Sequence, residues 1–563
     1  MPTPILLALL TLPAAQAETP SVADAATLTS DDVDAALRAI ELDFTPEEVE
    51  QMLGTVQRRV RQYERLRARS ISNDVVPATT TPWAAWLVPR AGQERTPAPT
   101  RLPKVARPED LDDACSWSIV ELAALLRTTD VTCVELTEAY LDRLERLDAR
   151  LHCVVTFTRE RALAQAAERD AELARGVDRG WLHGLPWGVK DLMAVEGHPT
   201  TWGARPFADQ SIDATAEVVR RLDEAGAILI AKLSVGALAM GDVWFRERTR
   251  SPWDTSRGSS GSSAGSAAAT AAGGVAFSLG TETLGSIVSP SVACATSALR
   301  PTLGRVPRTG TMALSWTMDK VGPIARTVQD ASLVFDAIRG ADAGDPASRD
   351  GAVPVAGDYA GRALRIGVPD GAFQRGGGVD EIAAELEALG HEIVPIELPD
   401  FPTRAMLVIL HAEAAAAFDE LTRSNADDEL VRQDDDAWPN TFRAARLIPA
   451  VEYVRAQRLR TLLMREMDAA LADVDLVVHA PYAAGVLTAT NLTGHPTVVA
   501  PFVPEDGPRP DGSPRTISFT GHLDCDEELL AAVVAWQDAN PHHVRRPPLA
   551  WLGGDDEEGE RRR

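Results

Sequence analysis

Two serine clusters lie close together in the sequence, at residues 258–265 (GSSGSSAG) and 284–287 (LGSI), joined by a run of small residues. A flexible linker would have a similar composition. A linker has no reason, however, to carry the helix-like run AAATAA or the apolar segment 275–277. These features predict a turn, a buried helix and a short strand, with a serine cluster at each end. Because buried elements of this kind would hold a serine hydroxyl rigidly at each end, we interpret this stretch as a catalytic core.

One alternative lies inside the first cluster. Residues 261–265 match G-x-S-x-G, the nucleophile elbow of α/β-hydrolases, with Ser263 as the nucleophile. That elbow follows directly on an apolar strand, whereas residues 251–257 have the composition of a loop. Five histidines could complete a Ser-His-Asp triad, none with a distinguishing context: His391, His411, His479, His495 and His522. An esterase of this type stays an open alternative.

Three motifs together resemble the amidase signature family. Residues 258–290 are similar to the family's GGSSGGSAAA followed by GTDTGGSIR-P. Residues 188–192 (GVKDL) resemble its G-[VI]-K-D segment, and residues 299–306 (LRPTLGRV) resemble LKPT-GRV. Residues 491–496 (NLTGHP) are also similar to an N-x-x-G-x-P segment that lies near the site in the family. Three motifs that occur in the same order as in the family are far more specific than any one of them. The resemblance runs from about Ser116 to about Pro548.

The resemblance implies a Ser-Ser-Lys triad. Ser286 would be the nucleophile, Lys190 the base, and Ser262 the relay that carries the proton between them. Ser262 would follow a cis peptide bond, and Gly261 ahead of it would remove a side chain that would clash. A lysine acts as a base only when neutral, so burial must lower its pKa from the ordinary value of about 10.4.

Backbone N–H groups beside the nucleophile would hold the oxyanion. The resemblance assigns these to Thr283, Leu284 and Gly285, together with Ser286 itself. Leu284 stands where the family usually has glycine, and Val288 where many members have arginine. Leucine offers the same backbone N–H, so the oxyanion hole should survive unless that position needs a positive φ. The loss of arginine leaves the substrate class open.

We therefore expect an amidase that acts on linear amides, meaning carbon–nitrogen bonds other than peptide bonds, through an acyl-serine intermediate. A glutaminase subunit of a tRNA-dependent amidotransferase is the main alternative. No Walker loop, H-E-x-x-H motif or cysteine cluster is present, so no cofactor and no metal are implied. The net charge of −26 argues against binding nucleic acid. The expected partner is a small-molecule amide, and assembly into a homodimer stays open.

The two ends of the chain differ from the rest. Residues 1–17 form an apolar run that closes in the A-x-A pattern at Ala15 and Ala17, which predicts a signal peptide and a secreted or periplasmic protein. The absence of Lys or Arg before the apolar run argues for a cytoplasmic location instead. No other segment predicts stable membrane insertion. The charged residues 549–563 predict a disordered tail.

Helix start signals divide the rest of the chain. Residues 18–75 predict an N-terminal helical extension, residues 76–115 a proline-rich linker, and residues 116–548 the amidase domain. Thr45, Ser118 and Thr132 each begin a capping box, with glutamate three residues later.

Predicted strands alternate with predicted helices in the main domain, which indicates an α/β fold with a largely parallel sheet. The resemblance implies a central mixed, twisted sheet surrounded by helices. Long helices are expected over residues 405–425 and 450–472.

Overall fold

The computed structural model describes residues 28–71, 75–79, 101–350, 362–373, 379–504, 506–549 and 551. Its centre is one open sheet of eleven strands, in the order β1-β3-β2-β4-β6-β5-β10-β11-β9-β7-β8. The strands are β1 (Val154–Phe157), β2 (Pro186–Lys190), β3 (Ile228–Leu233), β4 (Phe277–Glu282), β5 (Ser297–Arg300), β6 (Lys320–Ala325), β7 (Arg365–Pro369), β8 (Glu392–Ile396), β9 (Leu476–His479), β10 (Thr497–Phe502) and β11 (Arg515–Gly521).

The sheet is mixed, so the expectation of a largely parallel sheet is wrong and the arrangement implied by the resemblance is confirmed. Strands β2 and β3 are parallel, as are β2 and β4, β7 and β8, and β7 and β9. The other six pairings are antiparallel. Parallel neighbours need a crossover, which helices supply between β2 and β3 and between β7 and β8. Among the described residues, no α-helix lies between β5 and β6 or between β10 and β11, so these pairs can run antiparallel.

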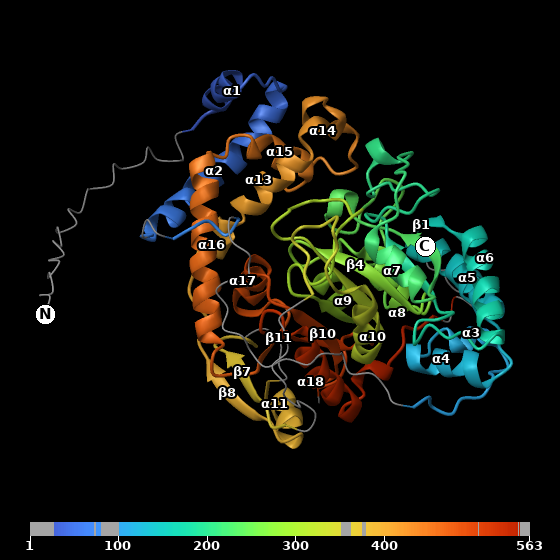
Figure 1. Cartoon of the computed structure of the whole chain (residues 1–563). Helices are drawn as coiled ribbons and strands as arrows, with labels where there is room; N and C mark the ends of the chain where they lie inside the picture. The colour runs from blue at the N-terminus through green and yellow to red at the C-terminus, as the bar shows by residue number, and fades with distance from the viewer. Residues whose placement is uncertain are drawn as a thin grey trace, which may run out of the picture.

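Helices surround this sheet (Figure 1). The α-helices of the first half are α1 (Ser30–Ala39), α2 (Pro46–Ala68), α3 (Leu111–Ala114), α4 (Ile119–Thr128), α5 (Cys133–Leu151), α6 (Arg159–Ala174), α7 (Glu217–Glu224), α8 (Ala264–Ala271), α9 (Val288–Cys294) and α10 (Val328–Ile338). Those of the second half are α11 (Val379–Ala388), α12 (Thr403–Met406), α13 (Val408–Ala417), α14 (Asp419–Arg423), α15 (Trp438–Ala445), α16 (Ala450–Ala470), α17 (Val486–Thr493) and α18 (Asp526–Ala539). Helices α10 and α18 pack against each other and against central strands, while α6 packs on β3.

All three predicted capping boxes are confirmed. The side chains of Thr45, Ser118 and Thr132 each accept a hydrogen bond from the backbone N–H three residues on, and the glutamate there bonds back to the cap. These local bonds fix where α2, α4 and α5 begin.

The single helix expected over residues 405–425 is broken into α12, α13 and α14. Phe418, between α13 and α14, has φ −114° and ψ 33°, outside the helical region. Its ring stacks on Phe442 at a centroid distance of 5.5 Å and meets Trp202 edge-on at 6.2 Å. Packing of this aromatic cluster therefore outweighs the helix propensity of the alanine run.

The N-terminal helices α1 and α2 lie against the second half of the chain. Helix α2 contacts α12, α15 and α16, and Arg67 on α2 binds the carboxylate of Glu452 on α16 at 2.6 Å. The expected signal peptide, residues 80–100 of the expected linker and residues 552–563 of the expected tail lie outside the described residues. None of the helices that the structure describes is long and apolar enough to cross a membrane.

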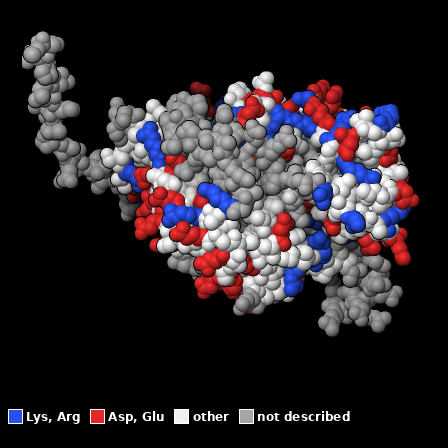
Figure 2. All heavy atoms as spheres, turned by 60° about the horizontal axis from the view of Figure 1, so that its bottom comes forward, with Lys and Arg blue, Asp and Glu red and all other residues white. Residues whose placement is uncertain are grey.

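The described surface carries charges of both signs. Figure 2 shows acidic and basic side chains interspersed over the visible face rather than gathered into one basic area.

Candidate active site

Lys190 is the last residue of β2, and its side chain is completely buried. Its Nζ lies 2.8 Å from Ser262 Oγ, 3.0 Å from Ser263 Oγ and 2.8 Å from Thr281 Oγ1. The carbonyl oxygen of Thr281 is 3.3 Å away. A neutral amine has two N–H groups and one lone pair, so it can donate to Ser263 and Thr281 while accepting the proton of Ser262.

Burial lowers the pKa of Lys190 well below its ordinary value, and the nearby carboxylates Asp319 and Glu282 oppose that shift only in part. Neither carboxylate forms an ion pair with the amine within the described chain. The environment therefore favours the neutral form of the lysine, which is the form that can accept a proton.

Ser262 follows a glycine, Gly261, that packs closely against the backbone of Gly241. The peptide bond between Gly261 and Ser262 is cis, as the resemblance implies. A Cβ at Gly261 would overlap the carbonyl oxygen of Gly241, so the expectation that glycine avoids a clash here is confirmed. Ser262 itself is 1% exposed.

Ser263 directly precedes α8 and has a structural role. Its backbone N–H and its hydroxyl both donate to the carbonyl oxygen of Ser286, at 3.1 and 2.5 Å. This pair of bonds holds the two serine clusters together. Ser263 is completely buried, its hydrogen-bond partners in the described chain include no histidine, and the residues before it form no strand. The nucleophile-elbow interpretation is therefore wrong.

Ser286 lies in the loop between β4 and α9 and is 8% exposed. Its hydroxyl forms no hydrogen bond within the described chain, and catalytic hydrogen bonds often tighten only when substrate binds. The backbone N–H groups of residues 283–286 likewise donate to no described acceptor. Gly285 has φ +82°, whereas Leu284 lies outside the left-handed region. Leucine at 284 is thus accommodated without backbone strain, and positive φ is required only at the glycine.

A buried carboxylate fixes this loop. Glu282 Oε2 accepts the N–H groups of Ile287 at 2.7 Å and Val288 at 2.9 Å. Its Oε1 accepts Nη1 of Arg300 at 3.1 Å and Nδ2 of Asn491 at 2.8 Å. Burial opposes ionisation of Glu282, but the charge of Arg300 and these hydrogen bonds outweigh it and lower its pKa. The chain on both sides of Ser286 is therefore tied to one ionised group.

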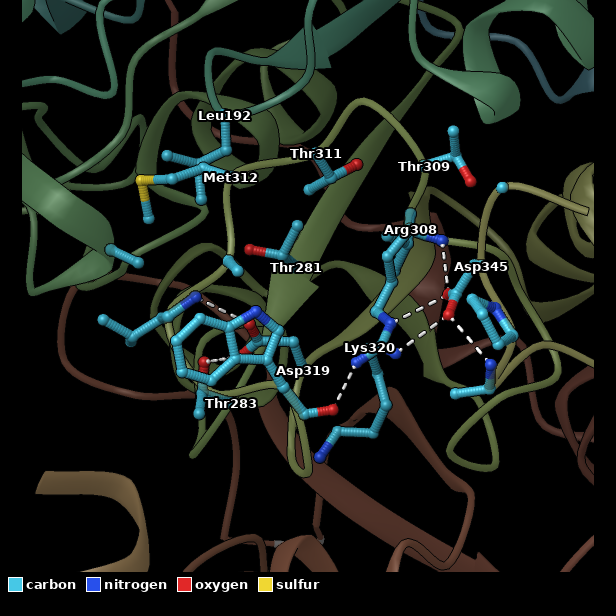
Figure 3. Close-up of a pocket in the computed structure, with 18 residues that line it drawn as sticks. Leu192, Thr281, Thr283, Arg308, Thr309, Thr311, Met312, Asp319, Lys320 and Asp345 are labelled. Carbon is cyan, nitrogen blue, oxygen red and sulfur yellow. Dashed lines mark hydrogen bonds and ion pairs between the residues drawn. The ribbon is translucent and has the colours of Figure 1, made fainter. Parts of the chain in front are cut away.

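A cavity of about 460 Å³ adjoins this arrangement (Figure 3). Thr281, which contacts Lys190, and Thr283, in the loop before Ser286, both line it. Asp319 also lines it and accepts the hydroxyl of Thr283 at 2.5 Å. The loop that carries Ser286, the side chain of Lys190 and the cavity therefore all lie at the end of strand β4.

The structure brings all of the predicted site residues to one region of the sheet, the carboxyl ends of β2 and β4. Sequence reasoning missed Glu282 and Asp319. Glu282 lies two residues before the second serine cluster and within residues 258–290, so its position alone could have marked it, whereas nothing in the sequence around Asp319 marks that residue. Arg300 and Asn491 belong to segments already similar to family motifs, and the structure shows that their shared contact is Glu282.

Comparisons with family models, curated proteins and solved structures all match this chain to amidases or amidotransferase subunits. The Amidase family profile matches residues 135–499. The chain is 33% identical to a Glutamyl-tRNA(Gln) amidotransferase subunit from Moorella thermoacetica, over 76% of this chain and 98% of that protein. It is 34% identical to the corresponding amidotransferase subunit from Chloroflexus aggregans, over 76% and 96%. The native peptide amidase from Stenotrophomonas maltophilia superposes with a TM-score of 0.67 at 29% identity, over 77% and 98%. The chain belongs to the amidase family.

Proposed function

We propose that this protein hydrolyses a carboxylic amide to the acid and an amine or ammonia through an acyl-enzyme formed on Ser286. The observation that carries the proposal is the buried amine of Lys190, whose pKa is lowered and whose Nζ lies 2.8 Å from Ser262 Oγ. The partners of this buried lysine are hydroxyl groups, and no described carboxylate contacts it, so a charged ammonium here would form no ion pair that stabilises the fold. The neutral lysine is well suited to accept a proton.

In the proposed reaction, Ser286 Oγ forms a bond to the carbonyl carbon of the amide. Its proton passes to Ser262, while the proton of Ser262 passes to Lys190. The oxyanion that develops is held by the backbone N–H groups of Thr283, Leu284, Gly285 and Ser286.

Collapse of that tetrahedral intermediate breaks the carbon–nitrogen bond, and the lysine returns the proton to the leaving nitrogen through Ser262. Water then attacks the acyl-serine as the lysine accepts its proton. The acid leaves, and Ser286 recovers its hydrogen by the same relay. One group thus serves as base and then as acid in each half of the reaction.

Covalent labelling tests this assignment. We expect a fluorophosphonate probe to label the wild-type protein and to leave Ser286→Ala unlabelled. Lys190→Met keeps most of the side-chain volume and should lower the labelling rate by about 10²–10⁴-fold, since a general base is lost. Ser289→Ala, in the same segment but outside the relay, is the matched control and should label normally. Normal labelling of Ser286→Ala, or of Lys190→Met at neutral pH, would overturn the mechanism.

A second candidate function is supported by the two bacterial relatives named above, each of which is part of an amidotransferase. In that case the protein would release ammonia from glutamine for a partner protein. An assay for ammonia from free glutamine, alone and with candidate partner proteins from the same operon, separates the two functions. The acidic chain, with its net charge of −26, opposes a direct contact with tRNA.

A further inference from the structure

The cavity beside Thr281 and Thr283, which we call the Trp316 cavity, is lined by β4, by the start of β6 and by chain segments on either side of β6. Its volume of about 460 Å³ is within the range of roughly 300–1,000 Å³ that is common for small-molecule sites. Four charged residues line it: Arg308, Asp319, Lys320 and Asp345. Whether each of these charges already has a partner within the protein decides what the cavity can bind.

The positive charge of Arg308 is used within the protein. Its guanidinium donates to both carboxylate oxygens of Asp345, at 3.0 and 3.1 Å, and to the backbone carbonyl of Trp316 at 2.7 Å. Asp345 also accepts backbone N–H groups from Arg308 and Ala347. In Figure 3 this ion pair lies on one side of the cavity.

The other two charged groups are also occupied. Asp319 accepts the Thr283 hydroxyl with Oδ1 and the N–H groups of Leu314 and Ser315 with Oδ2, at 2.8 and 2.9 Å. Lys320 Nζ donates to Asn491 Oδ1 at 2.9 Å, and burial lowers the pKa of this lysine well below its ordinary value. Among the described lining residues, the charges of Arg308 and Asp345 are paired with each other and both oxygens of Asp319 accept hydrogen bonds, while burial disfavours the charged form of Lys320.

The remaining wall is largely apolar. Leu192 and Met312 lie together on the side opposite the Arg308–Asp345 pair (Figure 3), and both side chains are buried. Trp316 also lines the cavity, and this large side chain is 51% exposed. An exposed indole at the edge of an apolar cavity offers a broad face for an aromatic or aliphatic group.

We infer that the Trp316 cavity binds an uncharged, apolar or aromatic group of the amide substrate, and that it discriminates against groups bearing a free carboxylate or ammonium. The inference rests on the proposed amide hydrolysis and narrows its substrate class. An ion moved into this cavity would lose much of its hydration without gaining an unpaired charge of opposite sign, which is strongly unfavourable. Free glutamine, which carries both charges, is therefore a poor substrate on this account.

The test compares two primary amides that end in the same reacting group. We expect kcat/KM for 4-phenylbutanamide to exceed that for L-glutamine by at least about 100-fold, because only glutamine brings unpaired ions into the cavity. Equal values, or a preference for glutamine, would overturn the inference.

Variants of Trp316 test the wall itself, with acetamide as a substrate too small to reach it. Trp316→Ala should lower the ratio of kcat/KM for 4-phenylbutanamide to that for acetamide by about tenfold, and Trp316→Phe should restore most of it. Val544→Ala, at a residue that is 59% exposed and outside the cavity, should leave the ratio unchanged. A ratio that Trp316→Ala leaves at the wild-type value contradicts the assignment.

Failure of the proposed function and failure of the neutral cavity give different results. If the fluorophosphonate probe does not label Ser286, the proposed function is wrong. If the probe labels Ser286 but glutamine is turned over as well as the phenyl amide, the chemistry stands and the neutral cavity is refuted.

Discussion

Replacing Glu282 by glutamine would test whether one buried charge holds the loop that carries Ser286. Glutamine has nearly the same shape, but it removes the negative charge that faces Arg300. Whichever oxygen the new N–H₂ group replaces, it faces two hydrogen-bond donors, either the loop N–H groups of Ile287 and Val288 or the side chains of Arg300 and Asn491. The substitution therefore changes the electrostatics and the tether of the loop while leaving the packing volume in place.

The expected loss can be worked from the contacts. Arg300 and Glu282 are both completely buried, with Nη1 and Oε1 3.1 Å apart. Removing one partner of such a pair leaves an uncompensated buried charge and destabilises a protein by about 3–5 kcal/mol. The pKa of Glu282 is lowered in the folded state, so its contribution to stability is present above the ordinary value of 4.5. That contribution is lost as the pH falls through the lowered pKa.

Chemical denaturation at pH 7, followed by tryptophan fluorescence, measures this loss, and the fluorophosphonate labelling rate measures the effect on the loop. Glu392→Gln is the matched control, because Glu392 pairs with Arg365 at a similar distance of 3.2 Å but both side chains are half exposed or more. The control should change stability little. If Glu282→Gln is no less stable than Glu392→Gln, or if it labels at the wild-type rate, the reasoning is wrong.

Three further outcomes are expected. Asp319→Asn removes the carboxylate that most strongly raises the pKa of Lys190, so the rising limb of the rate–pH profile should move to lower pH; an unchanged or upward-shifted limb would count against this. Gly285→Ala forces a side chain onto a backbone with φ +82° and should lower kcat by at least about tenfold, whereas Leu284→Gly should keep most of the activity; equal kcat values for the two would contradict it. If residues 1–17 are a signal peptide, N-terminal sequencing of the protein secreted by its native host should begin at Glu18, and an intact Met1 on a cytoplasmic protein would refute export.

Local signals in the sequence predicted local structure well. The capping boxes at Thr45, Ser118 and Thr132 set helix starts because every atom involved lies within four residues. The role of Gly261 was implied by the resemblance instead, and the structure gives its physical reason, since a Cβ there would overlap the carbonyl oxygen of Gly241. The order of three motifs was enough to identify the family.

Features that depend on distant parts of the chain were predicted poorly. The alternation of strands and helices does not reveal that β10, near the C-terminus, runs antiparallel to β5. The break at Phe418 depends on Phe442 and Trp202, which no helix propensity takes into account. Asp319 became visible as part of the site only once its contact with Thr283 was known.

The hydrogen-bond partners of Glu282 also determine how much of the chain must be translated before the loop that carries Ser286 can be held in place. Lys190, Ser262 and Ser286 have all left the ribosome before Asn491 is made, about 200 residues after Ser286. At synthesis rates of about 5–20 residues per second, that interval is about 10–40 s. Strand β10, which pairs with both β5 and β11, is translated directly after Asn491. We therefore expect a nascent chain that already contains Lys190, Ser262 and Ser286 to stay unreactive until Asn491 and β10 have also been made.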